Sequence, residues 1–295
     1  MAALLETTGN PIAAFGLGAV RALLAAALIC CSGAMAAADD SLYRAQTVVT
    51  GQGEPNRIIG FGACLEDVLI KVSGQPALAG DRRLAGYKSR AGEFVSSFDY
   101  HDQYAGKPHH DEQGTRDRPY DLTVAFDDKK VDGILARLGL KPWRSQRPVL
   151  GVFVEMQHGP KDIIVTSDGP QSDLQRDALA AAVTRRGMRF VLPDTAALTA
   201  AKVSAAELMK VSPAKLASIL APQRGEATLV GRLVWDDKDL GWVTQWQLAW
   251  HGRDYKWRLR GVTFDEAFRR GIGGAAQVLS GNGDPGRSRS AAVER

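Results

Sequence analysis

The stretch that most constrains the fold of this chain is an almost unbroken apolar run, Val149–Met156 (VLGVFVEM). β-Branched residues recur in it, and such residues favour strands. A strand that is apolar on both sides of its pleat has to be covered on both faces, as the central strands of α/β sheets are. We therefore expect the second half of the chain to fold as a sheet in which this strand is central and helices cover the faces.

The sequence after this strand predicts helices, a short strand and then an antiparallel meander. Ser172–Gln175 (SDLQ) has the capping-box pattern and predicts a helix that ends at Gly187. Thr263–Glu266 (TFDE) has the same pattern and opens a final helix with an apolar stripe. The remaining expected elements are a strand over Met188–Leu192, short helices over Ser204–Lys210 and Pro213–Leu220, and strands over Ala227–Trp235, Trp242–Trp250 and Tyr255–Arg260.

The first half of the chain has shorter elements in the order strand, helix, strand, strand, helix. Apolar residues recur every three or four positions between Asn56 and Val72, which is typical of a helix with one apolar face. Asp127 or Asp128 can cap the second helix, and Gly139 ends it. This order predicts a small α+β layer with helices on one face. The expected strands are Leu42–Thr50, Phe94–Tyr100 and Tyr120–Phe126, and Asp81–Ser89 is expected to form a short polar helix.

A segment with proline near both ends, Lys141–Pro148, is expected to link the two halves. The expected fold class is accordingly α/β (α+β), with two small domains that each contain a mixed sheet covered by helices. The expected division is a signal peptide at 1–38, an N-terminal α+β domain at 39–140, a linker at 141–148, a C-terminal α/β domain at 149–280 and a disordered tail at 281–295.

The N-terminal segment 1–38 has the pattern of a secretory signal peptide. Arg21 precedes the apolar run Ala22–Cys31, and Ala-x-Ala cleavage patterns lie within Ala34–Ala38. The apolar core is about half of the ~20 residues that a membrane-spanning helix needs. We therefore predict cleavage, export and a periplasmic location. A retained membrane anchor and a lipoprotein attached at Cys30 or Cys31 are the alternatives.

Cleavage would leave Cys64 as the only cysteine, so an intramolecular disulfide is excluded and a packed core has to supply the stability. The net charge is +4, and the basic residues are scattered among acidic ones rather than grouped in a stripe. Nucleic acid is therefore not expected as a partner. Weak attraction to anionic headgroups leaves peripheral membrane association open.

One loop carries the residue types that ligate metals. It also contains glycine and proline, and metal affinity requires ligands on a preorganised frame, so we expect a solvated loop and no metal site. A second acidic stretch lacks the glycine and the final glutamate of a calcium-binding loop and predicts a hairpin turn. The residues of the first loop are His101, Asp102, His109, His110, Asp111 and Glu112, and those of the second stretch are Asp236, Asp237 and Asp239.

No catalytic or cofactor-binding motif stands out elsewhere in the sequence. Cys64 would be a candidate nucleophile if a histidine lay beside it, but it lies in an apolar helical pattern and is expected to be buried. Gly60-Phe61-Gly62 lacks the third glycine and the preceding buried strand of a dinucleotide site. We therefore expect no enzyme activity, no cofactor, and no catalytic, cofactor-binding or metal-binding residue.

Three tryptophans, Trp242, Trp246 and Trp250, would share one face of a regular strand. They could form a stacking platform for a sugar or a peptide. The alternative, which we favour, is that the final helix covers this face, because its stripe offers a matching apolar surface. That stripe consists of Phe264, Phe268, Ile272, Ala275 and Leu279.

The order of short motifs from about Leu42 to Leu279 resembles DUF2066, a family of exported bacterial proteins of unknown function. The motifs include LYRAQTVV, VLIKVSG, GLKPWRSQRPVLGVFVEM, RRGMRFVLP and WVTQWQLAW. The resemblance implies export and this two-part fold but no reaction, because the matched positions look structural. The halves are also similar, more weakly, to two envelope assembly modules. These are the N-terminal module of a flagellar outer-membrane ring protein and the N-terminal α/β module of the Tol-system periplasmic propeller protein.

These observations favour an exported, non-catalytic accessory or scaffold protein of the cell envelope that binds an envelope protein partner. The alternative is a periplasmic binding module for a small molecule or a cell-wall glycan, which would use a groove between the domains or the tryptophan face. A hydrolase that uses Cys64 or the His101–His110 loop is the least favoured class.

Overall fold

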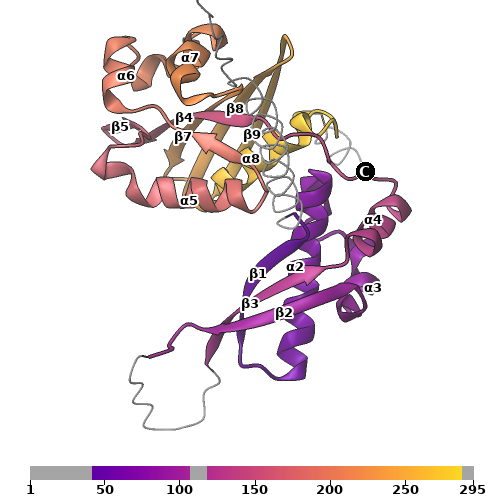
Figure 1. Ribbon diagram of the computed structural model, residues 1–295. Helices are drawn as coiled ribbons and strands as arrows, with labels where there is room; N and C mark the ends of the chain where they lie inside the picture. Colours follow the sequence, from indigo (N-terminus) through magenta and orange to yellow (C-terminus); the bar gives the residue numbers. More distant parts are fainter. Residues whose placement is uncertain (1–41, 107–117, 288–295) are drawn as a thin grey trace, which may run out of the picture. The chain divides into compact units, whose positions relative to one another are not determined.

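Two β-sheets with their helices make up the computed structural model of the protein, which describes residues 42–106 and 118–287 (Figure 1). Helices occur together with an antiparallel sheet and a mixed sheet, so the predicted α/β (α+β) class is confirmed, although only the second sheet is mixed. The predicted signal peptide at 1–38 lies outside the described residues. Within the described ranges, no helix combines the length and the apolar character that crossing a membrane requires.

The first sheet has three antiparallel strands in the order β1-β3-β2, and helix α2 packs along one of its faces. Gly60 permits this close approach, because a Cβ there would lie 2.6 Å from a Leu122 methyl group and 2.7 Å from a Val49 methyl group. On the opposite face, Val48 is 57% exposed. The elements are β1 (Arg44–Thr50), α2 (Glu54–Ser73), α3 (Ala85–Lys88), β2 (Val95–Asp102), β3 (Pro119–Phe126) and α4 (Asp128–Arg137).

The second sheet has the order β5-β4-β7-β8-β9, and β6 pairs with the part of β4 that β5 leaves free. β4 is parallel to β6 and β7, whereas the β7-β8-β9 meander is antiparallel. The strands are β4 (Val149–His158), β5 (Lys161–Ile164), β6 (Arg189–Val191), β7 (Ala227–Asp236), β8 (Gly241–Trp250) and β9 (Arg253–Val262).

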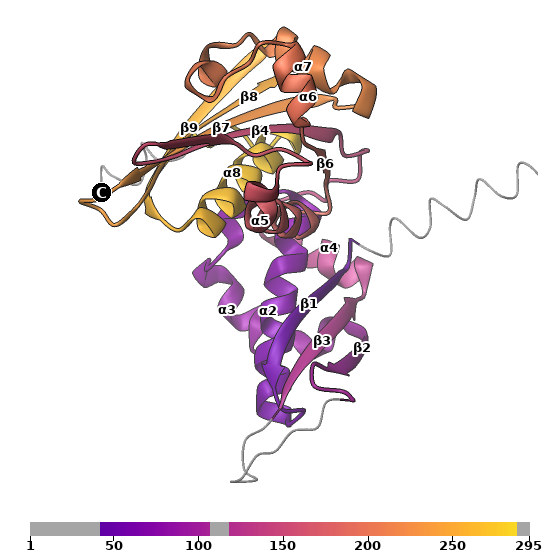
Figure 2. The same ribbon diagram turned by 90° about the vertical axis from the view of Figure 1, so that its left-hand side faces the viewer.

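Helices cover both faces of this second sheet, as the apolar run at β4 predicts (Figure 2). On one face, Val152 and Val154 pack in a core with residues of α5 (Asp173–Thr184) and α8 (Phe264–Leu279). On the other face, Phe153 and Val230 pack with residues of α6 (Thr195–Ala200) and α7 (Pro213–Leu220). β4 is therefore a doubly covered central strand.

The helix caps confirm two capping predictions and contradict a third. Thr263 accepts a hydrogen bond from the Glu266 N–H at 3.3 Å, and Asp127 accepts one from the Lys130 N–H at 2.9 Å, as capping residues do. Ser172 makes no such bond, because the 3-10 turn Pro170–Ser172 extends the start of α5 backwards and places Ser172 at φ −112°, ψ 8° rather than in extended conformation. The capping-box prediction at Ser172 is wrong.

Short elements were the hardest to predict. The sequence predicts no element over β5 or α6, since neither is long enough to show a period. The predicted helix over Asp81–Ser89 consists of the 3-10 turn Arg82–Leu84 followed by α3, and the predicted helix over Ser204–Lys210 is a 3-10 helix, Ala205–Lys210. The 3-10 turns of the described chain are Pro76–Leu78, Arg82–Leu84, Ala91–Phe94, Pro170–Ser172, Ala205–Lys210 and Ala221–Gln223.

Candidate functional site

The loop with metal-ligand residue types lies largely outside the described residues, which is the case for His109, His110, Asp111 and Glu112. His101 and Asp102 lie at the end of β2. Asp102 accepts a hydrogen bond from the Tyr104 N–H at 2.9 Å, which lowers the pKa of its carboxyl group and shapes the turn. Across 42–106 and 118–287, no group of three or more His, Cys, Asp or Glu residues could hold a metal ion.

Cys64 is fully buried in α2, within the core of the first sheet. Burial, together with the nearby Asp67 carboxylate, raises the pKa of its thiol to about 12. A nucleophilic cysteine needs the opposite environment, since the thiolate is the reactive form. Cys64 therefore has the surroundings of a packing residue.

Trp246 lies in the core of the second sheet, which confirms the expected cover by the final helix at this position. Its ring fills a slot between β7 and α8, because a Cβ at Gly231 or at Gly271 would lie about 2.5 Å from the ring atoms. The ring meets Phe268 edge to face at 6.5 Å, and its Nε1 donates to Thr244 Oγ1 at 3.1 Å. No part of this side chain remains for a ligand, because its exposed fraction is 0%.

The other two tryptophans of β8 lie in different surroundings. The pairing of β8 with β9 shifts between Trp242 and Thr244, so the strand is not regular there. Trp242 lies opposite Trp235, with ring centroids 5.6 Å apart, and both contact the His158 ring. Trp250 is half-buried and stacks on His251 at 4.1 Å. The three rings therefore do not form one stacking platform.

A groove of about 460 Å³ opens beside Trp242, and we call it the β4 groove. It lies on the α5 side of the second sheet, where β4 ends and the β4-β5 hairpin begins. Besides Trp242, its walls consist of Met156, His158, Lys161, Ile163, Gln171 and Gln175. Of the three tryptophans, Trp242 borders this groove, and its side chain is 9% exposed.

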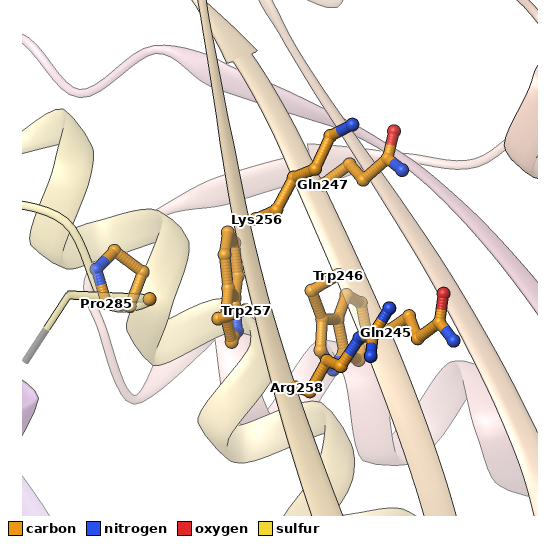
Figure 3. Close-up of a pocket in the computed structure, with 8 residues that line it drawn as sticks. Gln245, Trp246, Gln247, Lys256, Trp257, Arg258 and Pro285 are labelled. Atoms are coloured by element: carbon orange, nitrogen blue, oxygen red, sulfur yellow. The ribbon is translucent and has the colours of Figure 1, made fainter. Parts of the chain in front are cut away.

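A second concavity, of about 500 Å³, lies at the edge strand β9 (Figure 3). In Figure 3, the side chains of Gln245, Gln247 and Lys256 extend away from Trp257 and Pro285. The polar groups therefore do not converge on a common point, as they do in ligand sites. We assign no function to this concavity.

The first sheet carries an exposed apolar surface on its edge strand, which we call the β2 surface and define by β2 together with Arg57, Ile58, Phe61 and Phe98. Phe98 is 45% exposed and Ile58 is 44% exposed. The Phe98 ring packs edge to face against Phe61 at 5.1 Å, and the Arg57 guanidinium lies 5.9 Å from it. Among the described residues, β2 pairs with β3 alone, so its outer edge is open.

Sequence reasoning found the strand but missed this surface. The alternation Phe94, Ser96, Phe98, Tyr100 predicts a strand over Phe94–Tyr100. Phe94 instead belongs to a 3-10 turn, and a bulge between Val95 and Ser97 changes the register. Whether an alternating face is covered depends on a helix distant in sequence, and here α2 leaves Phe98 partly open.

A comparison with known protein families finds a match for part of the chain. Residues 36–144 are similar to a family described as Domain of unknown function (DUF8605), a stretch that contains the whole first sheet with α2 to α4. No curated protein and no solved structure matches the chain. No match to DUF2066 is found, so the resemblance to that family is wrong. The motifs that suggested it lie on strands, helix ends and the segment 141–148, and sequences of this kind recur in many α/β proteins and do not identify a family.

Proposed function

We propose that this chain is an exported, non-catalytic accessory protein of the cell envelope, and that it binds a protein partner through the β2 surface. The observation that carries the proposal is the open outer edge of β2, an eight-residue strand with the partly exposed Phe98 at its centre. The occupant that we propose is an extended segment of an envelope protein, added to the sheet as a further strand.

β2 is one of the two edge strands of the first sheet, and its outer edge is unpaired among the described residues. It presents unpaired N–H and C=O groups, which make it a template for another chain. Peptides that add to such an edge gain affinity from main-chain hydrogen bonds and specificity from side-chain pockets. Phe98, supported by Phe61 and Tyr100 at ring distances of 5.1 and 5.8 Å, provides an apolar anchor beside that edge.

Two further features support a non-catalytic role. The thiol of Cys64 is buried and its pKa is raised to about 12, which opposes nucleophilic chemistry. The concavity at β9 brings no titratable groups together at one point. Export itself rests on the charged, apolar and small-residue pattern of segment 1–38.

The proposal is tested by capturing partners from the native envelope with tagged full-length protein. Phe98→Ala should abolish capture of the partner and lower the free energy of unfolding by only about 1 kcal/mol, because the side chain is partly exposed. Val48→Ala is the matched control, since Val48 is an exposed apolar residue on the opposite face of the same sheet. Undiminished capture by Phe98→Ala would overturn the proposal.

A further inference from the structure

The β4 groove is a second surface, independent of the β2 surface, and its chemistry points to a small ligand. We propose that it binds a saccharide that carries an acidic group. Three observations support this class of ligand: the place of the groove in the sheet, its unpaired polar side chains, and the aromatic and apolar surface beside them.

The groove lies where ligands bind in open α/β sheets. β4 and β7 are parallel neighbours, and the groove opens at the carboxyl end of β4, beside Trp235 near the end of β7. In such sheets, ligands bind outside the carboxyl ends of the strands. Its volume of about 460 Å³ is within the range of small-molecule sites, which is roughly 300–1,000 Å³.

The polar side chains in the groove have no partner in the described parts of the chain. Lys161 and Gln171 are exposed and Gln175 is half-buried, and none of the three is engaged in a hydrogen bond or an ion pair with another described residue. The two amides can each donate to and accept from a ligand, as hydroxyl groups require. Gln175 comes from the first turns of α5, and Gln171 comes from the 3-10 turn before it.

The charge in the groove favours an anionic group on the ligand. Lys161 is a cation, and the residues that line the groove include no carboxylate. Asp173 of α5 is ion-paired with Arg176, and Asp162 lies opposite Gln157, on the other side of the hairpin from Lys161. A carboxylate on the ligand would therefore meet the Lys161 ammonium group with no protein carboxylate in the lining of the groove.

The remaining wall is aromatic and apolar. Trp242, Met156 and Ile163 line the groove, and the His158 ring lies 6.1 Å from the Trp242 ring. A pyranose ring presents C–H groups on one face and hydroxyl groups around its rim. The C–H face of the sugar would lie against the aromatic wall, and its hydroxyl groups would lie against Gln171 and Gln175.

Calorimetric titration of the full-length protein with a matched pair of disaccharides tests the inference. Cellobiose is neutral, and cellobiouronic acid differs from it by a single carboxylate. We expect both to bind, the acid more tightly. Lys161→Met should weaken binding of the acid at least about fivefold, the effect of losing one charged hydrogen bond, and leave cellobiose unchanged. Gln175→Leu should weaken both.

Lys215→Met is the matched control, because Lys215 is an exposed lysine on α7, on the opposite face of the same sheet. It should bind both disaccharides as the wild-type protein does. No heat of binding from either sugar at millimolar concentration would overturn the inference, as would equal affinities that Lys161→Met leaves unchanged. Equally tight binding of inorganic phosphate would show an anion site and would also overturn it. None of these results bears on Phe98 and the partner.

Discussion

Asp67 on α2 accepts two hydrogen bonds from the guanidinium of Arg185 at the end of α5, from Nε at 2.9 Å and from Nη2 at 2.6 Å. The two residues are 118 positions apart, so this pair joins the helix of the first sheet to a helix of the second. Arg147 also connects these two helices. It donates one hydrogen bond to the carbonyl oxygen of Lys71 on α2, at 2.8 Å, and another to the carbonyl oxygen of Arg186, just after α5. The Arg147 guanidinium also lies 4.1 Å from the centre of the Trp143 ring.

Removal of the Asp67 charge should therefore destabilise the protein. In Asp67→Asn, Arg185 loses its carboxylate partner, and we expect the free energy of unfolding to fall by about 1–2 kcal/mol. This is less than for a fully buried pair because the Arg185 side chain is 47% exposed. Asp173→Asn is the control, since that pair with Arg176 lies within one helix and Asp173 is 68% exposed. It should cost less than about 0.5 kcal/mol in urea unfolding, and equal effects would contradict this interpretation.

The buried thiol of Cys64 predicts a loss of stability at alkaline pH. Its pKa is raised from 9.0 to about 12 in the folded protein, so the unfolded chain loses the proton first as pH rises. Above pH 9 the free energy of unfolding should fall by up to about 1.4 kcal/mol per pH unit from this group. Urea unfolding between pH 8 and pH 10.5 measures the slope. Cys64→Ala should have a shallower slope, and an identical slope would show that the thiol is not protected.

Trp246 should be the most sensitive of the three β8 tryptophans. Trp246→Ala empties the slot between β7 and α8, and we expect a cost of about 3–5 kcal/mol, the usual effect for a buried large aromatic. Trp250→Ala should cost clearly less, because Trp250 is half-buried and stacks on His251. Denaturant unfolding measures both variants. Equal costs would mean that the ring of Trp246 is not packed as described.

The N-terminal pattern makes a prediction that needs no variant. If segment 1–38 is a cleaved signal, protein isolated from the envelope should begin between Ala36 and Asp40. N-terminal sequencing reads this directly. A chain that begins at Met1, or a lipid on Cys30 or Cys31, would mean that the segment is retained or processed differently.

The sequence predicted the elements that show their own period or composition. The apolar run of β4, the stripe of α8 and the strands of the meander were all found, because burial on one or both faces leaves a pattern along the chain. The four-residue strand β5 and the irregular start of α5 leave none, because local turns decide them.

Contacts between residues that are distant in sequence could not be predicted either. The prolines of 141–148 indicated a linker, but they report only that no helix or strand forms there. Trp143 is buried in this segment, and its backbone N–H donates a hydrogen bond to the Val72 carbonyl oxygen at 2.7 Å. Beyond the predicted end of the second domain, Asn282 donates to the Ser73 carbonyl oxygen. The division into two domains stays a prediction.

The β4 groove could not be predicted because its residues are distant in sequence. β4, β5, α5 and β8 each supply only one or two of them.

Crosslinking in cells tests directly whether a partner binds along the open edge of β2. A photoactivatable amino acid at Ser97 would lie on that edge, and the same group at Gln46 would lie on β1 at the other edge of the sheet. Illumination should give a crosslinked partner from position 97, none from position 46, and none from position 97 when Phe98→Ala is also present. No product from position 97, or the same product from both edges, would contradict a partner bound along β2.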